Sequence, residues 1–380
     1  MEQWPLPSHK LQQLHILVQQ QLDLGHIRQS LSPWNSPIFV IKKPNGTWRL
    51  LQDLRQVNNK MVPFGTPQRG LPWIPAIPSN HFITTIDIKD CFFSIPLHPD
   101  DMEKFAFSLP ALNFSGPDQR FEWTVLPQGM ANSPSICQNI LAQIFTSFFR
   151  NPDILFYIYM DDIILGAPDR SQLDLLTTEC LSILTHHNFK VASEKVQRIP
   201  PFKILGSLLS LDTVSPIRPQ LKIQPSYTLP QLQKLLGEIN WMRPWISIST
   251  EKLTPLFDLL KGSNLSSDII LNTEHIQTLN EVQRAIDKST LKRFTPSVPL
   301  ILYVFPGESL MTALLAQQGE PIQWIHLSVG GTPRVYAATD QLADCITKGR
   351  NNSLRLFGQD PSSIVIPYRT QDFTWLQRWP

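Results

Sequence analysis

Two adjacent carboxylates interrupt a stretch of sequence that otherwise has the character of a buried strand. In the run ILFYIYMDDIIL (154–165), only Asp161 and Asp162 are charged. Burying an ionised carboxylate without a counter-charge is very costly, so something must compensate for these two acids. Because Asp favours turns, the run is predicted to fold as a β-hairpin with both acids at or near the bend.

A third acid stands near the end of another apolar strand. Residues 81–88 are predicted to form that strand, with Asp87 next to its last residue. Side chains from neighbouring strands can converge, and carboxylate oxygens suit Mg²⁺ or Mn²⁺, which would supply the missing counter-charge. A polar turn without a metal would account for Asp161 and Asp162, but it would not account for the third acid.

Composition indicates a globular protein with more than one subdomain. The chain has 380 residues, a length that exceeds what one hydrophobic core usually organises. Hydrophobic residues make up 42% of it, which is enough to form sizeable cores. The net charge of +2 does not by itself indicate nucleic-acid binding, although residues 1–62 have a local excess of Lys and Arg. The four cysteines lack zinc-ligand spacing, and we identify no secretion or transmembrane signal.

Local patterns predict the remaining elements. Asn45-Gly46 favours a type I′ hairpin between strands at 37–43 and 47–51. Thr228 and Gln231 fit a capping box that starts a helix through Trp241. The proline-rich stretch 66–78 is expected to be an extended connector. Further helices are predicted at 8–24, 135–149, 274–288 and 336–347, and further strands at 298–305, 309–317, 322–327 and 363–367. The turns of this last meander are predicted at Pro306-Gly307 and Gly319-Glu320.

The chain resembles the retroviral reverse transcriptases, most closely those of betaretroviruses and related endogenous elements. The matching stretches, in family order, are SPWNSPIFVI (32–41), IDIKDCFF (86–93), LPQGM (126–130) with NSP (132–134), YMDD (159–162) and QKLLGEINW (233–241). The resemblance implies an α+β fold, a right-hand polymerase followed by an RNase H-like α/β connection subdomain. Its parts would be fingers (1–62 and 95–132), palm (63–94 and 133–211), thumb (212–290) and connection (291–380).

The resemblance also implies an RNA- and DNA-templated DNA polymerase that extends a primer 3′-hydroxyl with dNTPs by a two-metal-ion mechanism. Asp87, Asp161 and Asp162, with Ile88, would hold two Mg²⁺ or Mn²⁺ ions. Lys195 would protonate the departing pyrophosphate. The implied dNTP contacts are Lys43, Arg49, Asp90, Cys91, Phe92, Gln128 and Gly129, with the ring of Phe92 as the steric gate against ribonucleotides. The implied template–primer contacts are Tyr159, Met160, Gln233, Gly237 and Trp241.

Several of these residues also admit purely structural roles. The basic hairpin could be a solvated surface, and Phe92 could pack in a core, although the neighbouring Phe93 is the better candidate for packing. Gly129 could serve only to turn the chain, and Lys195 belongs to a Glu-Lys pair of the kind usually found in solvent. On the helix from Thr228, Gln233, Gly237 and Trp241 share one face. The apolar residues that face away are Leu232, Leu235, Leu236 and Ile239.

Two questions about activity stay open in the sequence. The strand predicted to begin the last unit, ILYVF (301–305), carries no acid, so RNase H activity is not expected. A non-catalytic structural subunit of a reverse transcriptase heterodimer, or a retained endogenous nucleic-acid-binding protein, would carry the same motifs. The expected partners are a template with its primer and dNTPs, with a homodimer or a heterodimer with a longer RNase H-containing form left open. The expected location is the virion or the host cytoplasm.

Overall fold

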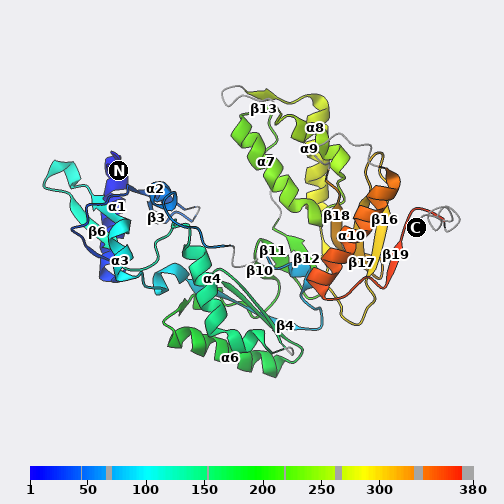
Figure 1. Cartoon of the computed structure of the whole chain (residues 1–380), viewed down its shortest axis with the longest axis horizontal. Helices are drawn as coiled ribbons and strands as arrows, with labels where there is room; N and C mark the ends of the chain where they lie inside the picture. Colours follow the sequence, from blue (N-terminus) through cyan, green and yellow to red (C-terminus); the bar gives the residue numbers. More distant parts are fainter. Residues whose placement is uncertain are drawn as a thin grey trace. The chain divides into compact units, whose positions relative to one another are not determined.

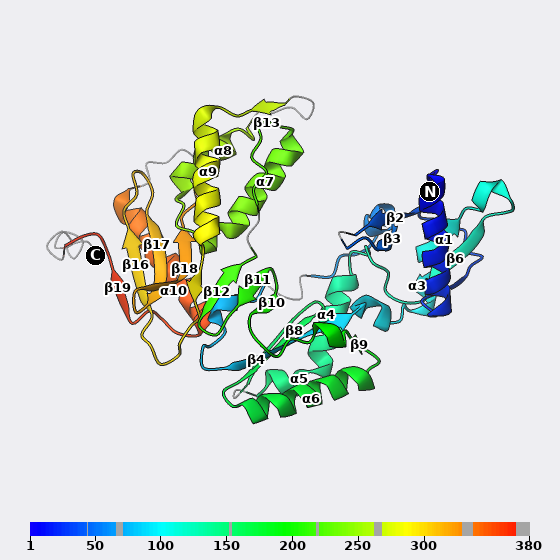
Figure 2. The same ribbon diagram turned by 180° about the vertical axis from the view of Figure 1, so that it is seen from behind.

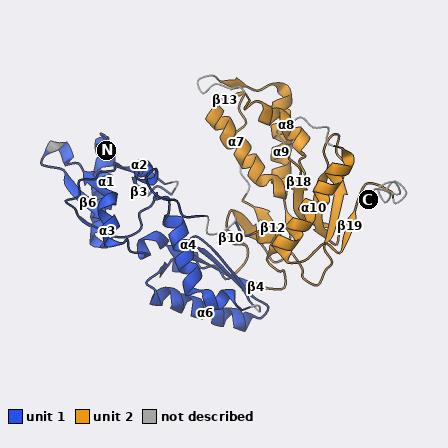
Figure 3. Ribbon diagram, viewed as in Figure 1, with its two compact units in different colours: residues 1–72, 82–198 blue, residues 73–81, 199–380 orange. Residues whose placement is uncertain are grey.

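The computed structural model describes residues 1–43, 45–65, 71–151, 154–217, 220–261, 268–328 and 337–369 (Figure 1). The chain divides into two compact units, residues 1–72 with 82–198 and residues 73–81 with 199–380 (Figure 3). Both units combine helices and strands around apolar cores, as the α+β class requires. Among the described residues, no helix is both long and apolar enough to cross a membrane.

A four-stranded antiparallel sheet carries the three acids of the first unit. Its order is β7-β8-β4-β9, formed by Leu155–Tyr159, Asp162–Ala167, Phe82–Lys89 and Lys190–Val191. Helices α4 (Ser133–Ile144) and α6 (Arg170–His186) pack against this sheet (Figure 2). Helix α6 begins where the Asp169 side chain accepts hydrogen bonds from two free N–H groups of the first turn.

The helix predicted at 135–149 is interrupted by core packing. Helix α4 ends at Ile144, and Phe145, with φ −103° and ψ 22°, separates it from the short helix α5 (Thr146–Phe149). The Phe145 ring is fully buried and lies 5.5 Å from Phe148 and 5.2 Å from Phe156, measured between ring centroids. The residue at which the helix breaks is thus part of a buried aromatic cluster.

The predicted basic hairpin is present, but its turn is longer than expected. Strands β2 (Ile38–Lys42) and β3 (Trp48–Gln52) are antiparallel. The Lys43 N–H donates to Thr47 O at 2.7 Å, so three residues, 44–46, separate the paired ends. The two-residue type I′ turn predicted at Asn45-Gly46 is therefore wrong. Three-residue loops commonly place a glycine in the left-handed region, and Gly46 has φ +86°.

Only part of the predicted connector at 66–78 can be compared with the structure, because residues 66–70 lie outside the described residues. The described remainder is not extended throughout. It contains the 3₁₀ turn η1 (Ile74–Ala76), all three residues of which are buried. Pro75 suits the first turn of such a helix, where its missing N–H costs nothing.

The second unit begins with a four-stranded sheet and a set of helices. The sheet has the order β10-β11-β12-β15, formed by Phe202–Ile204, Ser207–Leu209, Thr213–Pro216 and Leu291–Lys292. The helices are α7 (Leu229–Met242), α8 (Thr250–Asp258) and α9 (Thr273–Lys288). The capping box of Thr228 and Gln231 at the start of α7 is confirmed. Helix α8 was not predicted, because it contains Pro255, which normally argues against a helix interior.

A second four-stranded sheet follows, with one parallel strand at its edge. Its order is β18-β17-β16-β19, formed by Glu320–His326, Thr312–Gln317, Ile301–Phe305 and Ser363–Val365. Helix α10 (Ala338–Phe357) packs against this sheet. The second turn of the meander lies at Gln318-Gly319, one residue before the predicted position, because these are the two residues with positive φ, +53° and +80°.

The remaining elements are the 16-residue helix α1 and a number of short helices and strands. In the first unit they are α1 (Ser8–Asp23), β1 (Ile27–Gln29), α2 (Arg55–Asn58), η2 (Cys91–Ser94), α3 (Pro99–Met102), η3 (Glu103–Phe105), β5 (Ala106–Leu109), η4 (Leu112–Phe114), β6 (Gln119–Trp123) and η5 (Ser193–Lys195). In the second unit they are β13 (Ser226–Tyr227), η6 (Arg243–Trp245) and β14 (Ile269–Ile270).

We expect Gly349→Ala to destabilise the second unit, because α10 packs against β16 at this glycine. A Cβ at position 349 would lie 2.5 Å from Leu302 Cδ2, and Leu302 is fully buried. The overpacked variant should lose about 1–3 kcal/mol of unfolding free energy in urea titrations. Gly237→Ala is the matched control, since it also lies inside a helix but a Cβ there would contact nothing within 4 Å. It should gain about 0.5–1 kcal/mol. Equal effects of the two substitutions would contradict this account of the packing.

Candidate active site

Strand pairing brings the three acids to one end of the sheet in the first unit. Asp87 on β4 lies opposite Asp162 on β8, and Tyr159 at the end of β7 lies opposite the same Asp162. Met160 and Asp161 form the bend between β7 and β8, as predicted, with Met160 at φ +55°. The Ile88 N–H donates to Asp161 O at 2.7 Å, which ties the bend to the end of β4.

A buried glutamine from helix α4 holds this bend. The Met160 N–H donates to Gln138 Oε1 at 2.8 Å, and Gln138 Nε2 donates to Ile158 O at 3.1 Å. The side chain thus satisfies backbone groups on β7 and on the bend that follows it, although it comes from 20 or more residues away. Gln138 is not among the site residues predicted from the sequence. The available signal was a polar residue on the same helical face as Leu141, three residues later, which indicates a buried polar group with a specific partner.

The electrostatic environment of the acids disfavours their ionised forms. Burial, followed by the negative charges of Asp161 and Asp87, raises the pKa of Asp162 from 3.8 to about 6. Burial and then the charge of Asp87 also raise the pKa of Asp161, against the opposing effects of Lys195 and Arg49. The site therefore has a surplus of negative charge that a bound cation would relieve.

Lys195 supplies one cation at this site. Its Nζ lies 3.0 Å from both carboxylate oxygens of Asp87, and the hydrogen bond with Asp87 raises the pKa of Lys195. Lys195 is at the end of η5, 108 residues from Asp87 in sequence, and its side chain is 59% exposed. The structure thus brings this lysine to the acids, although much of its side chain remains in solvent.

The acids fit a divalent metal by their chemistry more than by their present arrangement. Carboxylate oxygens, of which this site has three pairs, are the hard donors that Mg²⁺ and Mn²⁺ prefer. Within the described ranges, however, no group of three or more His, Cys, Asp or Glu side chains is placed to hold an ion. The Asp87 carboxylate instead faces the Lys195 ammonium. The Ile88 side chain is a hydrocarbon without donor atoms, so only the backbone carbonyl of this residue could serve as a ligand.

Residues 90–93, which follow Asp87, differ in how far their side chains are buried. Asp90 has φ +48° and precedes η2, in which Cys91 is 5% exposed and Phe92 is half-buried against the core. The Phe93 ring stacks on Trp123, with centroids 5.3 Å apart and an interplanar angle of 15°. The packing role predicted for Phe93 is confirmed, whereas the gate role of Phe92 stays a prediction.

The stretch LPQGM forms a turn that requires glycine. Gly129 is exposed with φ +97°, a conformation that other residues rarely adopt, and a Cβ there would lie 3.7 Å from Gln52 O. Gln128 beside it is half-buried. On β3, which ends at Gln52, the Arg49 side chain is exposed.

The predicted face of helix α7 is also present. Gln233, Gly237 and Trp241 are exposed, and the apolar residues predicted to face away are buried, namely Leu232, Leu235, Leu236 and Ile239. Trp241 is 43% exposed, and its ring would lie 3.3 Å from a Cβ at Gly206 in the β10–β11 turn. Trp241 is thus not a core residue, and its ring rests on a neighbouring hairpin.

Comparison with known proteins finds family matches in three consecutive parts of the chain. Residues 41–209 match the family described as "Reverse transcriptase (RNA-dependent DNA polymerase)". Residues 216–280 match the "Reverse transcriptase thumb domain". Residues 308–379 match an "ERVK-8-like, RNaseH-like domain".

Curated relatives align with nearly all of the chain. The Gag-Pro-Pol polyprotein of Mason-Pfizer monkey virus is 43% identical over 386 residues, which cover 100% of this chain and 22% of that protein. The Gag-Pro-Pol polyprotein of mouse mammary tumor virus (strain BR6) is 43% identical over 387 residues, with the same coverage of 100% and 22%. The Intracisternal A-particle Pol-related polyprotein of mouse intracisternal a-particle MIA14 is 41% identical over 368 residues, 96% of this chain and 42% of that protein. The chain spans about a fifth of the length of the two Gag-Pro-Pol relatives.

We expect Asp162→Asn to stabilise the metal-free protein at neutral pH. The pKa of Asp162 in the folded state, about 6, exceeds its ordinary value of 3.8, so the folded state binds the proton more tightly. The stability that this provides at low pH is lost as pH rises through 6. Because the side chain is partly exposed, the gain at pH 7.5 should be about 1–2 kcal/mol.

Urea titrations in EDTA at pH 7.5 and pH 4.5 test this expectation. The advantage of Asp162→Asn over the parent should shrink at pH 4.5, where the parent carboxyl is largely protonated. Asp118→Asn is the control, because Asp118 lies exposed in a loop before β6. A stability gain for Asp118→Asn equal to that for Asp162→Asn would assign the effect to net charge.

Proposed function

The chain belongs to the retroviral reverse transcriptases, and from that membership we propose that it extends a primer 3′-hydroxyl with dNTPs on an RNA or DNA template. One observation carries the proposal. Asp87 and the adjacent pair Asp161 and Asp162 come from two separate parts of the chain and meet at one end of the β7-β8-β4-β9 sheet, within the part that matches the reverse transcriptase family. The proposed arrangement is a right hand with fingers (1–62 and 95–132), palm (63–94 and 133–211), thumb (212–290) and connection subdomain (291–380).

Asp87, Asp161 and Asp162 would hold two Mg²⁺ or Mn²⁺ ions, with the carbonyl of Ile88 as a backbone ligand. Such ions, when bound, lower the pKa of the primer hydroxyl and neutralise charge on the leaving pyrophosphate. The raised pKa of Asp162 supports this assignment, because burial and neighbouring negative charges disfavour its ionised form and a bound cation would offset that cost.

Lys195 would act on the leaving group. Its ammonium group lies 3.0 Å from Asp87 and keeps its proton at neutral pH, since Asp87 raises its pKa. Released from Asp87, it would donate that proton to a pyrophosphate oxygen. A lysine is suited to this task because it carries three donors on a flexible stem.

The incoming dNTP would be held from two sides. Arg49 is exposed on β3 and its charge lowers the pKa of Asp161, which supports a triphosphate contact, with Lys43, directly after β2, as a second cation. The turn with Gln128 and Gly129 would contact the nucleotide through side chain and backbone. Phe92 would lie under the sugar, with Asp90 and Cys91 beside it. The template–primer would contact Tyr159 and Met160, and Gln233, Gly237 and Trp241 on helix α7.

A non-catalytic subunit of a heterodimer is the second candidate function. The observation that favours it is the Lys195–Asp87 pair, which neutralises one of the three acids while the described acids form no metal-holding group. Primer extension by the isolated chain distinguishes the two functions. RNase H activity is not expected in either case, because β16, the strand that opens the last sheet, carries no acid.

We expect Asp161→Asn to abolish primer extension without unfolding the protein. Neutralising one ligand weakens the proposed metal site and removes no volume, so dNTP incorporation with Mg²⁺ or Mn²⁺ should fall on the order of 10²-fold or more. Thermal denaturation should show a Tm no lower than the parent value. Asp118→Asn serves again as the exposed control. Near-parental extension by Asp161→Asn would refute the assignment of the acids.

We expect Phe92→Val to relax the discrimination against ribonucleotides. An apolar pocket rejects an added hydroxyl only weakly, so rejection must come from a steric clash with the ring. The kcat/KM for an rNTP relative to the matching dNTP should rise about tenfold or more, which corresponds to about 1.4 kcal/mol. Phe92→Tyr should keep the parental ratio, because its ring is retained. An unchanged ratio in Phe92→Val would identify Phe92 as a packing residue.

A further inference from the structure

An asparagine at the end of helix α2 grips the turn that contains Gly129. Asn58 Nδ2 donates to Gly129 O at 2.9 Å, and Asn58 Oδ1 accepts from the Ala131 N–H at 2.9 Å. Both ends of one amide are therefore bonded to the backbone of a segment more than 70 residues away in sequence. Bonds to backbone atoms fix the path of the turn, whatever its side chains are.

A second asparagine makes the reciprocal connection. Asn132 Nδ2 donates to Val62 O at 2.9 Å, and Asn132 Oδ1 accepts from the Phe64 N–H at 3.0 Å. Asn132 is 5% exposed and immediately precedes α4. The two amides together join residues 58–64 to residues 129–132 by four hydrogen bonds. We call these two side chains the asparagine clasp.

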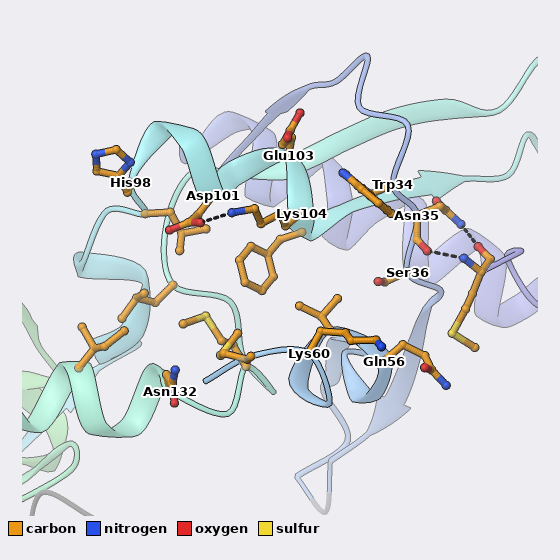
Figure 4. Close-up of a pocket in the computed structure, with 18 of the residues that line it drawn as sticks. Trp34, Asn35, Ser36, Gln56, Lys60, His98, Asp101, Glu103, Lys104 and Asn132 are labelled. Atoms are coloured by element: carbon orange, nitrogen blue, oxygen red, sulfur yellow. Dashed lines mark hydrogen bonds and ion pairs between the residues drawn. The ribbon is translucent and has the colours of Figure 1, made fainter. Parts of the chain in front are cut away.

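A cavity of about 1100 Å³ borders both joined segments (Figure 4). Its lining includes Met61 and Phe64 from the first segment and Met130 and Asn132 from the second. This pocket is open to solvent and Phe64 in its lining is 54% exposed, so apolar packing between the segments is limited here. The hydrogen bonds of the clasp therefore account for a larger share of what keeps the segments in register.

Strand β3 connects the segment held by the asparagine clasp to Arg49. The end of β3 at Gln52 lies against Gly129, and helix α2 follows after only two residues. A shift of the turn relative to α2 would thus also change its distance from the strand that carries Arg49. The structure points to one small unit, held by Asn58, that contains both proposed groups of dNTP contacts.

We propose that Asn58 and Asn132 are positioning residues that hold the 127–131 turn in the conformation that receives the incoming dNTP. The inference rests on the proposed function, because Gln128 and Gly129 are dNTP contacts only if the chain is a polymerase. Neither asparagine needs to touch the nucleotide. Asn58 is the better residue to test, since it is only half-buried and its loss should leave the fold intact.

The test compares Asn58→Ala, Asn58→Asp and Asn59→Ala in the full chain, bound to a template and a primer with a dideoxy end. Asn59 is the matched control, an exposed neighbour whose side chain makes no hydrogen bond with the described residues. The dissociation constant of the next correct dNTP should rise about tenfold in Asn58→Ala, which corresponds to about 1.4 kcal/mol. Template–primer affinity and the Tm should stay near those of the parent and of Asn59→Ala.

Asn58→Asp separates positioning from space filling. The variant keeps the size of the side chain and the acceptor for Ala131, but it sets a carboxylate oxygen against Gly129 O. A positioning role predicts at least the loss seen in Asn58→Ala, whereas a space-filling role predicts parental dNTP affinity. Amide hydrogen exchange over residues 127–134 should accelerate in both Asn58 variants and not in Asn59→Ala.

The outcomes distinguish this inference from the proposed function. Parental dNTP affinity in Asn58→Ala, or unchanged exchange over residues 127–134, would overturn the inference while leaving the proposed function in place. An equal loss of template–primer affinity and of dNTP affinity would also overturn it, since that pattern indicates general damage. If the parent complex bound no dNTP at all, the proposed function would fail and the inference would fail with it.

Discussion

The register between β4 and β8 is the constraint on which the candidate site depends. It places Asp87 opposite Asp162, while the neighbouring residues of both strands are buried. A slip by one residue would move every side chain of a strand to the other face and carry the acids into the core. The apolar residues that pack beneath the sheet therefore also fix the positions of the acids. The same strand register is required for core packing and for assembly of the site.

Charge at this site works against the stability of the protein. Burial and like charges raise the pKa values of Asp161 and Asp162, and the only ion pair recorded among the described residues for any of the three acids joins Lys195 to Asp87. Perturbed acids of this kind are typical of functional sites, where electrostatic strain is retained because the reaction uses it. The Lys195 ammonium neutralises part of the negative charge of the three acids. The negative charge that remains is suited to a divalent cation or to a cationic partner.

Amide side chains hold the unusual backbone conformations around the site. Met160 at φ +55° is bonded to Gln138, and the turn of Gly129 at φ +97° is bonded to Asn58. Strained or left-handed residues persist only where their surroundings over-determine them. An amide suits this task because it offers a donor and an acceptor on a short, uncharged group. The same physical device thus supports the acids and the neighbouring turn.

Local sequence patterns alone determined much of this protein. The β7–β8 hairpin with its acids, the α7 capping box and the exposed face of α7 follow from periodicity and from residues close in sequence, whose interactions do not depend on the rest of the fold. Packing and distant hydrogen bonds decided the rest, namely the break at Phe145, helix α8 despite Pro255, and the position of Lys195 on Asp87. Gln138 and Asn58 belong to this second group, because their partners lie 20 to 73 residues away. No local pattern encodes such a pairing, since which backbone group a side chain meets is settled only when separate elements pack together.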